Sequence, residues 1–365
     1  MTEEPAGFRI PWRALTMVGA LLIIWVVFSM TTEGRFLLPR NLALLVRQMS
    51  VTSLLAIGMV LVIVAGQIDL SVGALAGLLG GVSAMAFVRR GYPLPVAFLV
   101  PVLLGAFLGF LQGSLVARLR IPPFIVTLGG MLVFQGALLG LTGGVTTSPT
   151  SAYLVVGQSY LPRTIGWGVY GLLALGFALA AVRSPAPARW RWLGLIALGG
   201  LFTAVMNAYE GVPFPVLLVL VLAAALSLVA QHTPFGRHLY AIGGNREAAF
   251  YSGIPIERRL VGVFTLMGLM CGIAGVVLTA RVGSATSDAG RMMELDAIAA
   301  AVIGGASLLG GRGTVWGALL GALVMASLDN GMSLMNTESF WQPVIKGGIL
   351  VAAVAVDMAG RRGRA

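Results

Sequence analysis

Charged residues are scarce in this sequence of 365 residues, where Asp, Glu, Lys and Arg together make up only 10%, against about 25% in an ordinary soluble domain. Apolar residues make up 58%, and the mean hydropathy is +0.94. So few polar side chains cannot cover the surface of a soluble protein of this length. The composition therefore argues against a soluble enzyme, a nucleic-acid-binding protein or a disordered chain, and favours a membrane protein.

Cysteine and histidine are nearly absent as well, because the sequence has one cysteine, Cys271, and two histidines, His232 and His238. One cysteine allows neither an intrachain disulfide nor a cysteine-based metal site. The two histidines lie in one polar segment and have no acidic residue at the spacing of metal ligands. We therefore predict no metal site and no cofactor.

Catalytic motifs are missing too. The sequence contains no Gly-x-x-x-x-Gly-Lys-Ser/Thr phosphate loop, no His-Glu-x-x-His and no Gly-x-Ser-x-Gly. The single lysine, Lys346, follows Ile345 and so belongs to no phosphate-binding loop. We predict that the chain is not an enzyme and has no catalytic residues, and that any ATP hydrolysis comes from a separate partner subunit.

Long apolar runs, by contrast, are abundant. A membrane-spanning helix needs about 20 mostly apolar residues, and we count about twelve such segments. A β-barrel strand would alternate apolar and polar residues, so we predict an all-α polytopic membrane protein. Two segments, 192–206 and 297–309, are short for a full span and are expected to be tilted, broken or re-entrant. The segments are Ala14–Met30, Gln48–Gly66, Leu70–Val88, Pro93–Leu115, Phe124–Gly143, Gly166–Val182, Trp192–Met206, Pro213–Ala230, Leu260–Ala280, Ala297–Leu309, Thr314–Asn330 and Pro343–Met358.

Arginines between the apolar runs predict the orientation of the chain, because short cytoplasmic loops carry an excess of positive charge. We therefore assign the formal net charge of +11 to membrane orientation, not to nucleic-acid binding. Both termini are predicted to be cytoplasmic, as are residues 183–191, residues 231–259 and the tail with Arg361, Arg362 and Arg364. The acidic stretches 207–211, 281–296 and 331–342 are predicted to face outside. Basic residues that disagree with this orientation are Arg35, Arg40, Arg47, Arg89 and Arg90.

An internal repeat relates the two halves of the sequence. Residues 67–81 and 294–311 both start with an acid after an apolar residue and continue into a run rich in Gly and Ala. Because the matched helices are separated by an odd number of spans, we predict inverted halves with a pathway at their shared interface. Such an interface predicts transport. Further matches, in the same order, are 103–106 with 319–322, 111–113 with 329–331, and 129–133 with 347–351.

Residues 231–259 form the longest predicted cytoplasmic stretch between helices, and they contain the pattern of a short helix. Asn245 can cap its N-terminus, and Glu247 in its first turn suits the helix dipole. About two turns of helix are not stable alone. Since the helix displays Phe250 and Tyr251 outside the membrane, it either docks on a partner or is an ordinary surface loop.

Three segments of the sequence are found together in one family. They are Gly236-Arg-His-Leu-Tyr-Ala-Ile-Gly-Gly-Asn-Arg-Glu-Ala-Ala-Phe-Tyr-Ser-Gly-Ile254, Gly66-Gln-Ile-Asp-Leu-Ser-Val-Gly73 and Gly304-Gly-Ala-Ser-Leu-Leu-Gly-Gly-Arg-Gly-Thr-Val-Trp-Gly317. Over residues 41–358 the chain resembles the permeases of ABC importers for ribose, galactose and xylose, and the first segment resembles their ATPase-contacting loop. The extra hydrophobic pair around residues 183–213 resembles the xylose-type members more than the shorter ribose-type pattern.

This resemblance implies a ten-helix permease core with an extra pair of helices, all in one transmembrane domain, 1–365. We expect a first repeat half at 41–143, linking helices with the extra pair at 166–230, a cytoplasmic coupling loop at 231–259, and a second repeat half at 260–358.

The resemblance also implies partners. They are a cytoplasmic ABC ATPase with two cassettes in one chain, a periplasmic sugar-binding protein, a second copy of this chain in a homodimer, and membrane lipid, but no nucleic acid. By position, the residues expected to form the helix that couples to the ATPase are Gly244, Asn245, Arg246, Glu247, Ala248, Ala249, Phe250, Tyr251 and Ser252.

Polar side chains inside apolar segments are candidates for the translocation pathway. Gln112 and Asn330 occupy repeat-related places, where they either line a polar path for sugar hydroxyls or bond neighbouring helices. Asp69 and Asp296 either cap the helices that follow them or act as a proton relay.

Other side chains in or beside apolar segments also have two interpretations. Lys346 either pairs with Asp329 or extends toward the membrane interface. Trp316 and Trp341 either stack on a sugar ring or belong to the aromatic belt at the membrane interface.

We predict a permease subunit of an ABC importer that carries a monosaccharide, D-xylose or a related pentose or hexose, across the cell inner membrane. Alternatives are a permease of a related ABC system for branched-chain amino acids or nucleosides, an ion-coupled secondary transporter that titrates Asp69 or Asp296, and a scaffolding membrane protein. Uptake that survives an uncoupler and fails without ATP would exclude the ion-coupled alternative.

Overall fold

The computed structural model describes residues 12–362, in which the regular secondary structure is helical apart from two isolated bridges. The all-α prediction is confirmed. Both ends of the predicted domain 1–365, with Arg364 of the tail, lie outside the described residues. The helices are α1 (Trp12–Thr31), α2 (Pro39–Val64), α3 (Val72–Val88), α4 (Leu94–Ala117), α5 (Pro123–Thr142), α6 (Ser151–Gln158), α7 (Arg163–Arg183), α8 (Ala186–Asn207), α9 (Phe214–His232), α10 (Pro234–Gly244), α11 (Arg246–Tyr251), α12 (Ile256–Val282), α13 (Met293–Ile303), α14 (Val315–Leu334) and α15 (Trp341–Arg362), with a 3₁₀ turn η1 (Arg35–Leu37).

Within the described residues, seven helices are long and apolar enough to cross a membrane, namely α2, α4, α5, α7, α9, α12 and α14. Two shorter apolar helices, Met17–Thr31 in α1 and α3, accompany them. Their length and composition make this chain a polytopic membrane protein.

Each predicted hydrophobic segment coincides with a helix, but some boundaries differ for reasons that the residues explain. α2 starts at Pro39, well before Gln48, because proline suits the first position of a helix, where its missing N–H is not needed. Within residues 297–309, which were expected to be tilted, broken or re-entrant, the helix α13 ends at Ile303. Gly305 follows with φ +90°, a conformation that glycine adopts readily and that breaks the helix.

Two helices, α2 and α12, form the centre of the molecule and contact each other. α12 also packs against α3 and α4, while α2 packs against α13 and α14. The contact between α12 and α4 is close, since a methyl group added at Gly109 would lie 3.1 Å from the Cα of Gly268. Small residues that let backbones approach are typical of packed membrane helices.

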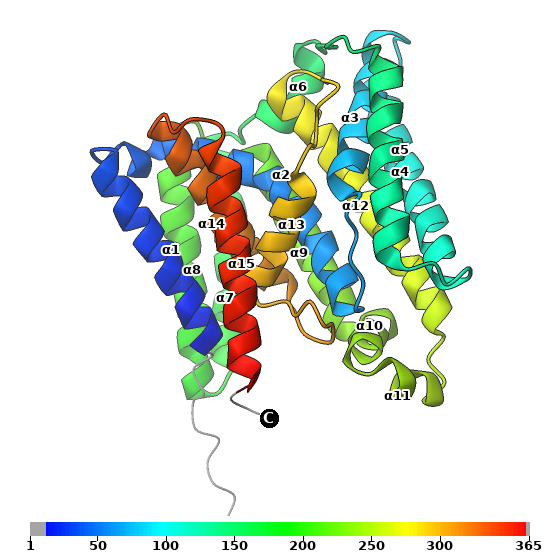
Figure 1. Cartoon of the computed structure of the whole chain (residues 1–365). Coiled ribbons are helices and arrows are strands. Elements are labelled where there is room, and N and C mark those ends of the chain that lie inside the picture. The colour runs from blue at the N-terminus through cyan, green and yellow to red at the C-terminus, as the bar shows by residue number, and fades with distance from the viewer. Residues whose placement is uncertain (1–11, 363–365) are drawn as a thin grey trace, which may run out of the picture.

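The outer helices pack on this centre from several sides. α5 packs against α3 and α4, and α15 packs against α13 and α14. α7 and α8 pair mainly with each other, and α8 also contacts α2. In Figure 1 these two helices lie on the same side of the molecule as α1, away from α4 and α5.

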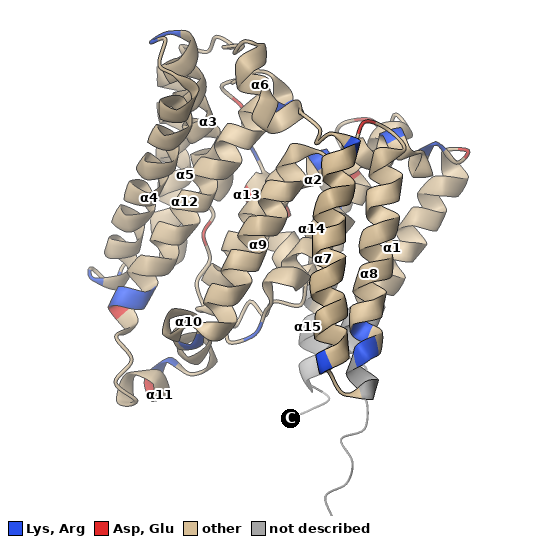
Figure 2. Ribbon diagram, turned by 180° about the vertical axis from the view of Figure 1, so that it is seen from behind, with Lys and Arg blue, Asp and Glu red and all other residues tan. Residues whose placement is uncertain are grey.

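The loops gather at two ends of the molecule. In Figure 1, α10, α11, the turn between α7 and α8 and the C-terminal end of α15 lie at one end, which we call the α11 end; α6 lies at the opposite end. Figure 2 shows charged residues concentrated toward both ends, with long uncharged stretches of helix between them. The arginine-rich stretches 183–191 and 231–259 thus share one end, as the charge pattern predicts.

Candidate functional site

The predicted short helix of the polar loop is present as α11. The side-chain oxygen of Asn245 accepts a hydrogen bond from the Ala248 N–H at 2.9 Å, so Asn245 is its N-cap. Glu247 lies in the first turn. Phe250 and Tyr251 are 66% and 78% exposed, and their rings pack edge to face. The sequence prediction of a capped helix that displays two aromatic side chains is confirmed.

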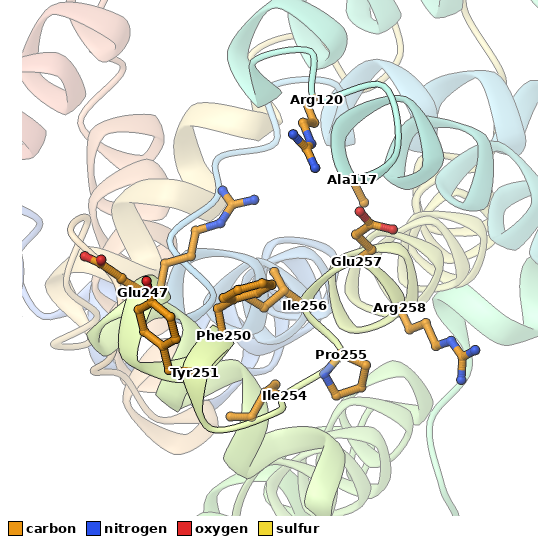
Figure 3. A pocket seen from close by; sticks show the side chains of 11 residues that line it. Ala117, Arg120, Glu247, Phe250, Tyr251, Ile254, Pro255, Ile256, Glu257 and Arg258 are labelled. Atoms are coloured by element: carbon orange, nitrogen blue, oxygen red, sulfur yellow. The ribbon is translucent and has the colours of Figure 1, made fainter.

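A cleft of about 700 Å³ lies beside α11. Figure 3 shows Phe250 and Tyr251 on one side and Ala117 with Arg120, from the end of α4 and the turn that follows it, on the other. Exposed aromatic rings between charges of both signs form a surface suited to a protein partner. The lining residues are Ala117, Arg120, Arg246, Glu247, Phe250, Tyr251, Ile254, Pro255, Ile256, Glu257 and Arg258.

The three segments that carry the family resemblance meet at one place, which we call the glycine junction. It consists of Gly66 after α2, Gly243 in α10, and Gly310 and Gly311 in the loop between α13 and α14. A methyl group added at Gly243 would overlap the backbone of α2 and lie 2.6 Å from the Gly311 nitrogen. One added at Gly310 would lie 2.9 Å from the Gly243 Cα. The three backbones therefore touch with no side chain between them.

Two hydrogen bonds hold the glycine junction together. The Gly311 N–H donates to the Val64 carbonyl oxygen at 2.9 Å, and the Tyr240 hydroxyl donates to the Gly313 carbonyl oxygen at 2.7 Å. Gly310 and Gly311 have φ values of +87° and +73°, in the left-handed region that favours glycine. The loop that leads into α14 is thus hydrogen-bonded both to the end of α2 and to α10.

Asp69 and Gln112, both predicted as pathway residues, lie in one buried cluster. Asp69 accepts hydrogen bonds from the Ser71 N–H at 2.9 Å and from the Ser71 hydroxyl at 2.6 Å. The Gln112 amide donates to the same hydroxyl oxygen at 3.0 Å. Asp69 binds the backbone just ahead of α3, while Ser71 occupies the N-cap position. The cluster ties the start of α3 to α4.

Asn330 makes a reciprocal pair with Asn41. The Asn41 amide donates to the Asn330 oxygen at 2.7 Å, and the Asn330 amide donates back at 3.1 Å. Both side chains are buried, and the pair joins α2 to α14.

Asp296 lies in the first turn of α13 and is bound by Lys346 of α15. The Lys346 ammonium lies 3.0 Å from the Asp296 carboxylate and 2.8 Å from the Asp329 carboxylate of α14. The three side chains are 16% to 22% exposed. Of the two interpretations of Lys346, pairing with Asp329 is therefore the one observed, and Asp296 joins the same ion pair.

Sequence reasoning missed Ser71 and Asn41, which bond the predicted residues Gln112 and Asn330. Ser71 carries a weak signal, because Asp-x-Ser ahead of an apolar run is a common turn before a helix. Nothing in the sequence around Asn41 identifies Asn330 as its partner. Trp316 and Trp341 are 46% and 48% exposed, and neither lies in the buried clusters. Within residues 12–362, no group of three or more His, Cys, Asp or Glu side chains is arranged to hold a metal ion.

Comparison with known proteins shows a clear relationship. Residues 41–354 match the model of a family described as branched-chain amino acid transport system / permease component. The chain is 47% identical to the xylose transport system permease protein XylH of Escherichia coli K12, covering 96% of this chain and 93% of that protein. XylH of Haemophilus influenzae is 45% identical, covering 95% of this chain and 96% of that protein. The D-allose transport system permease protein AlsC of Escherichia coli K12 is 32% identical, covering 97% and 94%. No solved structure matches the chain.

Proposed function

Since the chain belongs to the branched-chain amino acid transport system / permease component family, we propose that it is the membrane permease of an ABC importer for a monosaccharide, D-xylose. The observation that carries this proposal is the 47% identity to XylH over nearly the whole chain, against 32% to the allose permease AlsC. The protein is a multi-pass component of the inner membrane. Like the permeases it resembles, it is not itself an enzyme, and a separate ATPase subunit supplies ATP hydrolysis.

The test is uptake in proteoliposomes that contain the permease, its ATPase and its sugar-binding protein. We expect ATP-dependent uptake of labelled D-xylose, unaffected by an uncoupler. Labelled leucine and nucleosides serve as competing substrates, since the family description names branched-chain amino acids. Uptake of leucine in place of xylose would refute the sugar assignment.

We propose that the chain contains twelve membrane segments arranged as an inverted repeat, with residues 41–143 and 260–358 as its halves. The packing supports this proposal, because contacts occur in exchanged pairs. α2 packs against α13 and α14, as α12 packs against α3 and α4. Likewise α5 packs against α3 as α15 packs against α13. A two-fold relation between the halves produces such an exchange. Residues 166–230 then form the linking helices, and residues 231–259 the coupling loop.

The α11 end is proposed to face the cytoplasm, with both termini on that side. Support comes from the short arginine-rich turn at 183–191 and from the four arginines of residues 231–259, which share this end. Five arginines remain on the outer side in this orientation, against the usual preference, namely Arg35, Arg40, Arg47, Arg89 and Arg90.

The proposed coupling element is residues 244–252, which contain α11 and its caps. Phe250 and Tyr251 would enter a groove of the ATPase, and closure of the two ATPase cassettes would push on α11. This assignment is supported by the exposure of both rings and by the capped ends of the helix. Deletion of residues 244–252 should abolish transport and association with the ATPase, and leave membrane insertion intact. Association that persists in the deletion variant would contradict the mechanism.

Transport also requires the remaining proposed partners: a second copy of the chain in a homodimer, membrane lipid, a two-cassette ATPase and a periplasmic sugar-binding protein. Open faces on α5 and α15 fit a second copy, since Gly129, Gly140, Gly347 and Gly348 have no atom within 4 Å of an added methyl group. The binding protein would supply most of the affinity for the sugar, so the permease needs only weak polar contacts.

Gln112, Asn330, Asp69 and Asp296 remain proposed pathway residues. In this conformation their polar atoms are bonded to other residues of the protein. The bonds of Gln112, Asn330 and Asp296 join separate elements of one half or of both halves, whereas Asp69 bonds locally to Ser71. A rearrangement that opened the path between the halves would have to exchange these bonds for bonds to water or sugar.

A further inference from the structure

One polar cleft lies outside the sites described so far. It lies between α5, the start of α3 and the loop that precedes α13, and its volume is about 480 Å³. Small-molecule sites in proteins have volumes of about 300 to 1,000 Å³, so the cleft is large enough for a single sugar ring. Its lining residues are Ala74, Leu132, Gln135, Gly136, Leu139, Ser287, Asp288, Ala289 and Arg291.

The side chains of this cleft match the chemistry of a neutral sugar. Sugar hydroxyls donate and accept hydrogen bonds, so their site needs partners of both kinds. Asp288 accepts, Arg291 donates, and Gln135 and Ser287 do both. Leucine side chains from α5 supply an apolar surface for the C–H groups of the ring.

The charges in the cleft are available to a ligand. The Arg291 guanidinium lies 3.4 Å from the Asp288 carboxylate, and the two side chains are 69% and 71% exposed. An ion pair so exposed is held weakly, and its atoms can exchange for sugar hydroxyls. The ion pair of Lys346 differs, since its atoms are closer and its side chains mostly buried.

The surroundings indicate that the cleft does not face lipid. Leu132 and Leu139 on the same face of α5 are exposed, as a membrane helix requires, but Asp288 and Arg291 stand beside them. Charged side chains and irregular backbone at a lipid surface are costly. This face is therefore covered by a second protein surface or lines an aqueous space.

The cleft also joins the two halves. Its walls on α3 and α5 belong to the first proposed half, and residues 287–291 belong to the second. The two parts are in direct contact, because a methyl group added at Gly290 would lie 3.0 Å from the Gly77 nitrogen of α3. In Figure 1, α13 lies between the two ends of the molecule. Inverted-repeat transporters bind substrate at such an interface between repeats.

We propose that this cleft is the site at which the permease holds the sugar during translocation. Gln135, Asp288 and Arg291 hydrogen-bond to the hydroxyls of a neutral monosaccharide, while Leu132 and Leu139 contact its C–H face. The proposal rests on the proposed sugar transport and adds the residues that would touch the sugar.

The test measures labelled D-xylose transported per ATP hydrolysed by the full complex in proteoliposomes. Gln135→Leu should lower this ratio about 3- to 10-fold, the loss expected for one hydrogen bond. Arg291→Gln should lower it more, because bonds to charged groups are stronger. Gln342→Leu on α15, outside the cleft, is the matched control and should leave the ratio unchanged. A merely structural role would reduce sugar uptake and ATP hydrolysis together.

A second measurement is independent of transport rate. The native Cys271 is fully buried, so Gln135→Cys introduces one accessible thiol. An impermeant maleimide should modify it, and D-xylose should slow the modification. Absence of protection by xylose would overturn the cleft assignment, as would unchanged ratios in Gln135→Leu and Arg291→Gln. Absence of ATP-dependent xylose uptake by the wild-type complex would instead overturn the proposed function.

Discussion

Substitution of Gly243 by alanine tests how motion at α11 reaches the membrane helices. The added methyl group would overlap the backbone of α2 and lie 2.6 Å from the Gly311 nitrogen, whereas an ordinary contact is at least 3.4 Å. Backbone atoms cannot rotate away as a flexible side chain can. α10 must therefore move by about 0.8 Å or more relative to the loop before α14, and further relative to α2.

Such a displacement should lower the folding stability only slightly, but it should strongly impair the coupling of ATP hydrolysis to sugar transport. Overpacking by one methyl group costs about 1 to 3 kcal/mol, partly offset because alanine is a better helix former than glycine by about 1 kcal/mol. We therefore expect the variant to fold and insert. Misplacement by about 1 Å can reduce the rate of a process that depends on alignment by about 100-fold. Sugar transport should fall at least about tenfold, while the ATPase stays associated through the unaltered α11.

The assay compares xylose uptake, ATP hydrolysis and co-purification of the ATPase for the wild type, Gly243→Ala and a matched control. Gly176→Ala on α7 is the control, because it makes the same change in a helix where no atom lies within 4 Å of the new methyl group. We expect ATP hydrolysis without proportional xylose uptake in Gly243→Ala, but not in the wild type or in Gly176→Ala. Uptake equal to that of the wild type would refute the idea that the glycine junction transmits the motion.

Two further changes test the local structure. Asn245→Ala removes the N-cap of α11, which costs about 1 kcal/mol, and should weaken ATPase association about fivefold in a pull-down titration. Asn245→Asp is the control and should retain association, because aspartate keeps the side-chain acceptor. Equal weakening by both variants would count against capping. Lys346→Met leaves Asp296 and Asp329 unpaired, which costs about 3 to 5 kcal/mol for a buried pair, and should lower the thermal stability in detergent. Adding Asp296→Asn and Asp329→Asn to Lys346→Met should restore the thermal stability. If Lys346→Met alone were as stable as the wild type, the ion pair would contribute nothing to stability.

Helices were predictable from the sequence wherever one uninterrupted apolar run supplies the signal. α4, α5, α9 and α12 follow such runs, because hydrocarbon solvent leaves backbone groups no partners outside a helix. α6 was not predicted, since its eight residues, Ser151–Gln158, are too short and too polar to be recognised as a span. The point at which α13 ends could not be located from the sequence, because the apolar residues Leu308 and Leu309 continue the composition of a span after glycines have ended the helix.

Sites were predictable only where the signal is local. The N-cap of α11 depends on residues within one turn, and Asn245 with Glu247 in the first turn was sufficient to predict it. Asn41 and Asn330 are 289 positions apart, so nothing in either neighbourhood identifies the other as a partner. The glycine junction is similar: each segment was noticed for its family pattern, but only the fold brings Gly66, Gly243 and Gly310 together.

The packing around α10 explains why glycine suits position 243, close to the proposed contact with the ATPase. α11 packs against α10, and α10 packs against the two central helices, α2 and α12. In the proposed inverted repeat these helices contact elements of the opposite half, so a displacement of α10 would act on both proposed halves at once. A long side chain between α10 and α2 would absorb part of that displacement by changing its rotamer, since rotamers exchange at little cost. Direct backbone contact leaves no such flexible element, and the motion at Gly243 must pass to the Val64 end of α2.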